Sequence, residues 1–513
     1  PDIVEILTKL AEIYHLQGRY SQAEAICKEN YQLGKSLLGE MHPDVVRILN
    51  NLAILYDAQS KYIEAEKVLT EALLIVGSQF GRNHPQTAVI MNNIATVYSS
   101  LERYSDAEEI CLKVLEIRKN IFGEEHPDIT NSFNNLAEIY LAQGKYPEAE
   151  KYYKLALSLR KQLLGHNHPD VAFSLNNLST LYAAIKRYNE ALSYRIQASH
   201  IHDKLISNVF GFSSENDRLA FIDKIRGSFD LFLSLIYQHF PNSQEAINSA
   251  FDFILKRKGL SATSLTAQNQ AFYNGQYPHL TEKFHQLQEL SNQIIHLTIS
   301  ASQTQNLTNY QTNLNQLQNQ YDNLQKQIAT QVPEIQLSQQ IPNREAVASA
   351  LPANSVLIEF VQIDVFDFQA IRAKGETQWQ PFHYLAFILP VGKPDTVQMI
   401  DLGEVEKIDE LISKFRLQVS DVNAQTLGFK KSIPVKPKLQ IKQYNPTDSI
   451  QLSKLILSPI LEKLDSHCQK IIFAADGNLN SVPLQILPVD EIGKRLLMDE
   501  YTRSEEHTLN SSH

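Results

Sequence analysis

Residues 126–167 read HPDITNSFNNLAEIYLAQGKYPEAEKYYKLALSLRKQLLGHN, and this stretch decides the fold of the N-terminal part of the chain. Its His-Pro pair recurs every 42 residues, at His42-Pro43, His84-Pro85 and His168-Pro169. Two tyrosine positions and one alanine position keep the same period: Tyr14, Tyr56, Tyr98, Tyr140 and Tyr182; Tyr20, Tyr62, Tyr104, Tyr146 and Tyr188; Ala23, Ala65, Ala107, Ala149 and Ala191. Such a period indicates stacked units, because one unit cannot bury its apolar face alone. We therefore expect a solenoid over residues 1–200, with units beginning at residues 1, 43, 85, 127 and 169.

Each unit reads as two helices joined by a short turn. Pro127 suits the first turn of a helix, where its missing N–H costs nothing. Apolar residues then follow at helical spacing, and the second helix begins at Tyr146, after the turn Gln143-Gly144-Lys145. Gly165 follows the second helix, where glycine is typical of a C-terminus. The small residues that let the two helices approach closely are Ala137, Ala149 and Ala156.

This pattern resembles the tetratricopeptide repeat, in the 42-residue form of kinesin light chains and many bacterial proteins. The resemblance covers residues 1 to about 200 and implies a mainly α chain with a right-handed solenoid, whose first helices line a concave face. It places a column of carboxamides on that face: Asn50, Asn92, Asn134 and Asn176, each followed by a second asparagine. A carboxamide carries donor and acceptor together, so the column predicts a surface that clamps an extended peptide or a partner protein. The alternative is that these side chains bond across to the next helix and lock the stack.

Composition and residue spacing argue against several classes of protein: nucleic-acid binding, membrane-spanning, disulfide-stabilised and metal-binding. The net charge of −10 argues against nucleic acid as a partner, because that requires a basic face. The sequence has no run of 18 apolar residues, so we expect no membrane span. Three cysteines, Cys27, Cys111 and Cys468, predict no disulfide framework and fit the reducing cytoplasm. The recurring histidines lie a whole repeat apart, and no zinc or phosphate-loop spacing is present, so we expect no metal site and no cofactor.

The 42-residue period fades after about residue 200, and residues 201–342 read as a helical connector. Helices are expected over 216–239 and 244–258, the second ending on a basic cluster and Gly259, as helix C-termini often do. Residues 281–330 are rich in Gln and Asn, but their apolar residues alternate steps of four and three. This spacing predicts an antiparallel coiled-coil hairpin that turns at 300–306 and serves for spacing or self-association. Disorder is the alternative that the composition leaves open.

After Pro342 the helical spacing of apolar residues gives way to short runs of β-branched and aromatic residues, which are typical of strands. The expected strands are Ser355–Val361, His383–Leu389, Val397–Asp401 and Lys470–Ala474, and the expected helices are Val405–Phe415 and Ser449–Leu464. Alternating strands and helices predict an α/β sheet that is largely buried on both faces. In order and spacing, residues 343–502 resemble the N-terminal part of a CHAT domain, a caspase-like domain that bacteria fuse to tetratricopeptide arrays. Ala475 departs from the family, which usually has Pro before Asp-Gly.

The CHAT resemblance implies a cysteine peptidase of the caspase–separase clan for the full-length parent, with a His-Cys dyad. That chemistry requires an imidazole that takes the thiol proton. Both motifs would follow Asp476, where this sequence has neither a His-Gly pair nor a cysteine, and Cys468 does not substitute for them. We therefore expect no catalytic residues here and interpret the chain as an interaction scaffold. The alternative is the regulatory or substrate-recognition part of such a peptidase. Residues 503–513 are polar and aperiodic, and we expect a non-native tail there.

Overall fold

The computed structural model describes residues 2–16, 19–210, 226–273, 277–300, 307–332, 343–426, 446–490 and 492–501. The chain divides into two compact units. The first comprises Pro1–Ile201 and Asp367–Gln378, and the second comprises His202–Phe366 and Trp379–His513. The expected tail at 503–513 and most of the expected turn at 300–306 lie outside the described residues.

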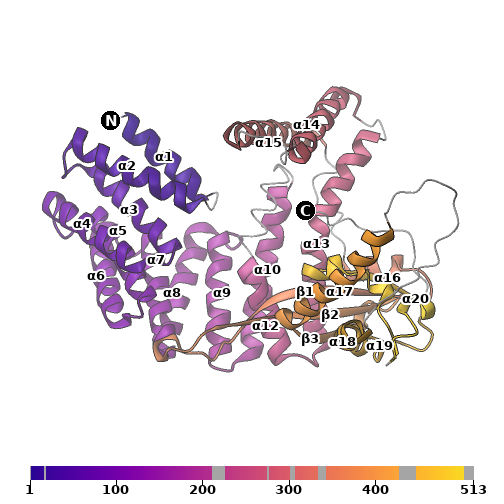
Figure 1. Ribbon diagram of the computed structural model, residues 1–513. Coiled ribbons are helices and arrows are strands. Elements are labelled where there is room, and N and C mark those ends of the chain that lie inside the picture. Colours follow the sequence, from indigo (N-terminus) through magenta and orange to yellow (C-terminus); the bar gives the residue numbers. More distant parts are fainter. Residues whose placement is uncertain are drawn as a thin grey trace. The chain divides into compact units, whose positions relative to one another are not determined.

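The first unit is built from helical hairpins that follow one another along the chain (Figure 1). Its described helices are α1 (Asp2–Leu16), α2 (Tyr20–Leu38), α3 (Pro43–Ala58), α4 (Tyr62–Phe80), α5 (Pro85–Ser100), α6 (Tyr104–Phe122), α7 (Pro127–Ala142), α8 (Tyr146–Leu164), α9 (Pro169–Ala184) and α10 (Tyr188–Phe210). From α1 to α9, each helix packs against the next. The helical-hairpin solenoid that the 42-residue period predicts is therefore confirmed.

The His-Pro pair explains where each first helix of a unit begins. Proline occupies the first turn of α3, α5, α7 and α9, and the histidine before it is the N-cap. In each case the histidine Nδ1 accepts a hydrogen bond at 3.2 Å from the backbone N–H two residues later: His42 from Asp44, His84 from Gln86, His126 from Asp128 and His168 from Asp170. These histidines therefore satisfy helix N–H groups that would otherwise lack a partner.

Small residues allow the two helices of a unit to pack closely. The repeated alanine of each second helix is completely buried, at 0% exposure: Ala23, Ala65, Ala107, Ala149 and Ala191. Gly165 is the C-cap of α8, as its place in the sequence predicts, and its φ of +81° is one that other residues rarely adopt.

The second unit begins with helices. The described ones are α12 (Arg226–His239), α13 (Gln244–Tyr273), the 3₁₀ turn η1 (Pro278–Leu280), α14 (Thr281–Ser300) and α15 (Leu307–Ala329). The prediction that the second connector helix ends near residue 258 is wrong, because α13 continues to Tyr273. Lys258 pairs with the carboxylate of Glu359 instead of with a helix end. The helices α14 and α15 occupy the residues of the expected hairpin and share a core that includes Phe284, Leu287 and Ile328. None of the described helices combines the length and apolar composition that a bilayer-spanning segment needs.

A mixed sheet of four described strands follows, in the order β3-β2-β1-β4. Its strands are β1 (Ser355–Phe366), β2 (Trp379–Pro390), β3 (Gln398–Glu404) and β4 (Lys470–Ala474), at the four places that the sequence predicts. The pairs β1–β2 and β2–β3 are antiparallel, and β4 runs parallel to β1, with Val356 opposite Ile471. The associated helices are α16 (Arg344–Ala350), α17 (Val405–Thr426), α18 (Pro446–Ile456), α19 (Ser458–Leu461) and α20 (Leu497–Glu500).

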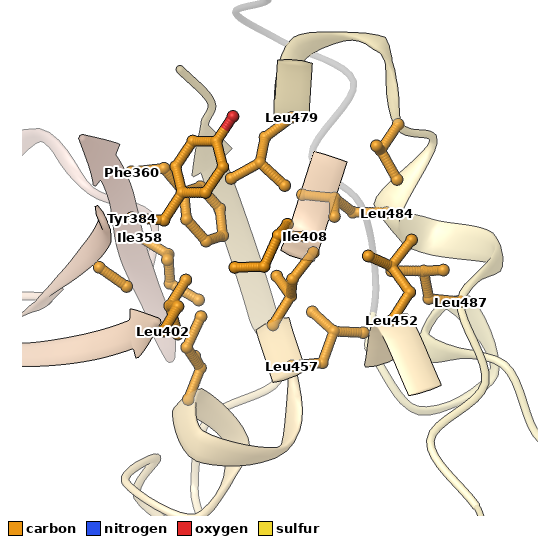
Figure 2. Close-up of a cluster of buried hydrophobic side chains, with 14 of the residues drawn as sticks. Ile358, Phe360, Tyr384, Leu402, Ile408, Leu452, Leu457, Leu479, Leu484 and Leu487 are labelled. Atoms are coloured by element: carbon orange, nitrogen blue, oxygen red, sulfur yellow. The ribbon is translucent and has the colours of Figure 1, made fainter. Parts of the chain in front are cut away.

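Apolar side chains bury both faces of this sheet. On one face, Phe360 and Tyr384 of the strands share a core with Ile408 of α17 and Leu452 of α18 (Figure 2). On the other face, Phe387 of β2 lies against Phe251 of α13, with ring centroids 6.0 Å apart. This burial fits the near-continuous apolar runs from which the strands are predicted.

Candidate functional site

The asparagine column occupies one position of four successive first helices. Asn50 lies in α3, Asn92 in α5, Asn134 in α7 and Asn176 in α9. The next residue in each helix is also an asparagine: Asn51, Asn93, Asn135 and Asn177. Because first helices of neighbouring units lie near one another, the structure brings these carboxamides together across unit boundaries.

Hydrogen bonds link the carboxamides of neighbouring units. They run from Asn93 Nδ2 to Asn50 Oδ1 (2.6 Å), from Asn135 Nδ2 to Asn92 Oδ1 (2.9 Å) and from Asn177 Nδ2 to Asn134 Oδ1 (2.7 Å). In each pair, the second asparagine of one unit donates to the first asparagine of the preceding unit. We call this set of residues the asparagine ladder. These are the bonds between neighbouring units that we expected if the asparagines stabilise the stack of repeats.

The ladder carboxamides differ in burial and in how much of their capacity they use. Asn134 is 4% exposed, and its Nδ2 donates to Glu138 Oε1 at 3.1 Å. Asn50 and Asn92 are half-buried, and their Nδ2 atoms donate to no group in the described part of the chain. Since a carboxamide has both a donor and an acceptor group, these two side chains keep N–H groups for a further partner.

A buried guanidinium ends the ladder in the fifth unit. Arg195 of α10 is 1% exposed, and it donates from Nη1 to Asn176 Oδ1 at 2.9 Å and from Nη2 to Thr180 Oγ1 at 3.2 Å. Burial lowers the pKa of Arg195 to about 9. Earlier units have Leu69, Cys111 and Tyr153 at the corresponding position. Arg195 thus donates to the side-chain oxygen of Asn176. In the earlier units, an asparagine of the following unit donates to the equivalent oxygen.

A second set of cross-unit contacts joins the second helices, and our sequence expectations missed it. A glutamate near the start of α2, α4, α6 and α8 pairs with a cation just before the second helix of the next unit. The pairs are Glu24–Lys61 (2.8 Å), Glu66–Arg103 (2.8 Å), Glu108–Lys145 (2.9 Å) and Glu150–Arg187 (3.7 Å). All eight residues keep the 42-residue period, so the repeat itself carried the signal.

Glu24 shows how strongly such a contact perturbs a carboxyl group. Its carboxylate accepts hydrogen bonds from Lys28, Lys61 and Gln59. Burial alone raises the pKa of Glu24, but these bonds outweigh burial and lower the pKa to about 2. The first helical hairpin is therefore tied to the second by a charge that persists well into acid.

The cysteine of the second unit lacks the environment of an activated thiol. Cys468 Sγ lies 3.5 Å from the carbonyl oxygen of Lys470, and burial raises the pKa of the thiol. A nucleophilic cysteine needs the opposite shift, toward thiolate. The imidazole of its neighbour His467 contacts Asp465 at 3.0 Å instead. Among the described residues, no three His, Cys, Asp or Glu side chains gather closely enough to hold a metal ion.

The Asp-Gly-Asn segment after β4 is fixed to the sheet by hydrogen bonds. Asp476 Oδ2 accepts from the backbone N–H of Gln362 at 2.9 Å, and the N–H of Asn478 donates to Tyr384 Oη at 3.1 Å. A Cβ atom at Gly477 would lie 2.6 Å from that same Oη, so only glycine fits there without displacing the tyrosine.

Comparison with known families matches a tetratricopeptide-repeat model to residues 2–75, 58–120, 86–162 and 128–199. The units of the array are therefore tetratricopeptide repeats. A search of curated proteins gave no significant match.

Several solved structures share part of the fold. A putative kinesin light chain from Podosopora anserina with nearly identical TPR-like repeats is 23% identical, covers 40% of this chain and 97% of its own, and has a TM-score of 0.35. BtubC from P. vanneervenii is 25% identical over 40% of this chain and 81% of its own, with a TM-score of 0.36. The apo form of RapI is 19% identical over 55% of this chain and 92% of its own, with a TM-score of 0.37.

Proposed function

We propose that this chain is an interaction scaffold whose tetratricopeptide array binds an extended peptide, or a partner protein, through the asparagine ladder. The observation that carries the proposal is that the side-chain oxygens of the ladder accept bonds between units, while the N–H groups of two ladder residues have no acceptor among the described residues. Each bond between units consumes one donor and one acceptor, while Asn50 and Asn92 keep their N–H groups. An extended backbone presents carbonyl groups that such donors recognise without reading the sequence.

Locking and clamping support one another in this arrangement. The bond from Asn135 Nδ2 holds the carboxamide of Asn92 in one orientation before any partner arrives. A side chain that is already fixed loses less conformational freedom when it binds, so its hydrogen bond contributes more to affinity. The locking contact is therefore part of the proposed binding surface.

A pair of substitutions at Asn92 separates the two roles. Asn92→Asp keeps an oxygen that accepts from Asn135 but removes the outward donor, whereas Asn92→Ala removes both groups. On an array of extended decapeptides, we expect the full-length chain to retain a set of peptides that both variants lose. Asn50→Asp, which removes the other unused donor and keeps the oxygen that accepts from Asn93, is expected to weaken the same peptides. If Asn92→Asp retains them all, or the unsubstituted chain retains none, the proposal is rejected.

We also propose that residues 343–502 are the N-terminal part of a CHAT domain. The four strands at the expected places and the helices on both faces of the sheet support this assignment. The alternative function, the regulatory part of a caspase-like peptidase, depends on it. The test is the coding sequence that follows residue 502 in the source genome, where a His-Gly strand and then a Cys-bearing strand are expected. Hydrolysis of peptides by the present chain, lost in Cys468→Ala, would show that our assignment of no catalytic residue is wrong.

The remaining proposals concern location and assembly. We propose a cytoplasmic location, which fits the free thiols of Cys27 and Cys111, and self-association through the hairpin of α14 and α15. Leu290 and Leu317 of the hairpin are half-buried and do not belong to its core cluster, so they contribute apolar surface to such an association. Light scattering of the full chain should show an oligomer that Leu317→Lys reduces to the monomer. A monomer before substitution would exclude the proposed association.

A further inference from the structure

The connection between β1 and β2 belongs to the array by its contacts. Residues Asp367–Gln378 form one compact body with the tetratricopeptide repeats. The side chain of Gln369 donates from Nε2 to the carbonyl oxygen of Ala183, in the last turn of α9, at 2.9 Å. The last carbonyl groups of a helix have no hydrogen-bond donor within the helix, and such a side chain supplies one. The segment is therefore seated where the first helices of units end.

Ile371 lies at a turn of the array whose central residue has no side chain. The residue between the two helices of a unit has positive φ, and it is Ser60, Glu102, Gly144 or Lys186 in the four units where it is described. Only Gly144 offers no side chain, and an ideal Cβ there would lie 3.4 Å from Ile371 Cδ1. The fourth unit thus differs from its neighbours at the point where this isoleucine lies.

Charge adds to the contact. The carboxyl group of Glu138, about one turn before the end of α7, has a pKa that burial raises, and the hydrogen bond from Asn134 and the positive charges of Arg372 and Arg160 oppose that shift. Arg372 also acts electrostatically on Tyr104, at the start of α6. A cation at this place also suits the negative end of the α7 dipole.

Hydrogen bonds within the segment fix its shape. The backbone N–H of Asp367 donates to the carbonyl of Gln378 at 2.7 Å, and the N–H of Ile371 donates to Glu376 Oε2 at 2.7 Å. The 3₁₀ turn η5 (Arg372–Lys374) follows, and residues 372–377 are exposed. A closed, preordered loop thus presents an amide and an isoleucine to the array, and the exposed Arg372 beside them acts on it through its charge.

We propose that the helix ends around Gly144, Glu138 and Ala183 form a second docking surface of the array, specific for a short turn that carries an aliphatic residue beside a cation. Residues 367–378 are its resident and exchangeable occupant. The segment is held by the hydrogen bond of Gln369, by half-buried Ile371 and by Phe368, which is 2% exposed. Release therefore uncovers an aromatic and an aliphatic side chain, and a partner turn of the same chemistry offsets that cost when it takes the place of the segment. A partner that presents a turn of the same chemistry binds only when this segment leaves.

Trypsin cleavage of the full chain after Arg372 and Lys374 measures how often the segment is released. Gly144→Lys copies the turn of the fifth unit and blocks Ile371, whereas Gly144→Ala has the same backbone requirement but only van der Waals contact with Ile371. We expect about tenfold faster cleavage in Gly144→Lys than in the unsubstituted chain, since cleavage follows the open population, and little change in Gly144→Ala. Equal cleavage rates in all three chains would overturn the proposal.

A labelled peptide tests exchange directly. A disulfide-closed peptide of residues 367–378 is added to the full chain carrying Ile371→Asp, which vacates the surface. We expect this peptide to bind that chain, to bind the unsubstituted chain at least tenfold more weakly, and to lose binding when Gly144→Lys is added. Binding that is unaffected by Gly144→Lys, or no binding to the vacated chain, would refute a docking surface at Gly144. The result is independent of the asparagine ladder.

Discussion

Removing one ladder donor at a time tests whether the asparagines stabilise the stack of repeats. Asn177→Ala and Asn93→Ala each delete the donor of one cross-unit bond. They leave behind acceptors in different surroundings, because Asn134 is 4% exposed whereas Asn50 is half-buried. The two variants therefore differ in what the deletion leaves unsatisfied.

The burial of the abandoned acceptor sets the size of the effect. A hydrogen bond contributes about 1 kcal/mol net, and a buried acceptor left without a partner costs about 2 kcal/mol more. Alanine offsets about 0.6 kcal/mol of this through its better helix propensity. We predict that Asn177→Ala lowers the local free energy of unfolding by about 2 kcal/mol. For Asn93→Ala, water reaches the abandoned carbonyl, and the predicted loss is about 0.5 kcal/mol.

Hydrogen exchange of the backbone amides reports these local free energies in the full chain, in α7 and α9 for Asn177→Ala and in α3 and α5 for Asn93→Ala. Thr96→Ala is the control, because Thr96 is exposed and its hydroxyl bonds only to the carbonyl of Asn92 in its own helix. That control should stay within about 0.5 kcal/mol of the unsubstituted chain. If Asn177→Ala costs no more than Asn93→Ala, the ladder does not stabilise the array in the way argued.

Three further predictions concern charge and caps. The pKa of Glu24 is lower folded than unfolded, so its contribution to stability is full above pH 4.5 and is lost as the pH falls toward 2; Glu24→Gln should flatten acid unfolding curves by about 2 kcal/mol over that range. Lys258→Met leaves the carboxyl of Glu359 buried at 4% exposure and should cost about 3 kcal/mol at pH 7. Thermal melts should show that this cost shrinks at pH 5 and in the double variant with Glu359→Gln. His126→Ala should lower stability by about 1 kcal/mol in urea unfolding, whereas His126→Asn, which can still cap α7, should not.

The helix positions of the array could be predicted from the repeat. The ends of some elements of the second unit could not, because tertiary contacts determine them. Hairpin positions follow from the 42-residue period because each unit solves the same packing problem. The end of α13 does not follow from local signals, since the cations that suggest a C-terminus include Lys258, which bonds to Glu359 101 residues away. Likewise β1 extends to Phe366, whose backbone N–H donates to Ser234 Oγ of α12 at 3.1 Å. That partner is invisible in a strand pattern.

In the candidate site, too, the sequence predicts the positions of the residues but not the contacts that they make. The sequence places Asn50, Asn92, Asn134 and Asn176 in one column, but it does not say which neighbour each carboxamide bonds. That choice depends on the offset between adjacent helices, which puts Asn135 rather than Asn134 opposite Asn92. The contact of Ile371 with Gly144 has no local signal either, because it joins two loops far apart in the chain.

Departures from the repeat locate what is particular to this array. Contacts that recur in several units, such as the asparagine ladder, would contribute affinity by number and would not distinguish one end of a partner from the other. A residue that breaks the register acts at a single place. Arg195 of the fifth unit is such a residue, and Gly144 of the fourth unit differs from Ser60, Glu102 and Lys186, although the first unit also has a glycine, Gly18, at that position. If the proposed function holds, the ladder of the second to fourth units is a generic backbone clamp, and Gly144 and Arg195 are the features that set the fourth and fifth units apart from it. Grafting the turn of the fifth unit onto the fourth, as in Gly144→Lys, should erase one of these features while leaving the ladder bond between Asn177 and Asn134 intact.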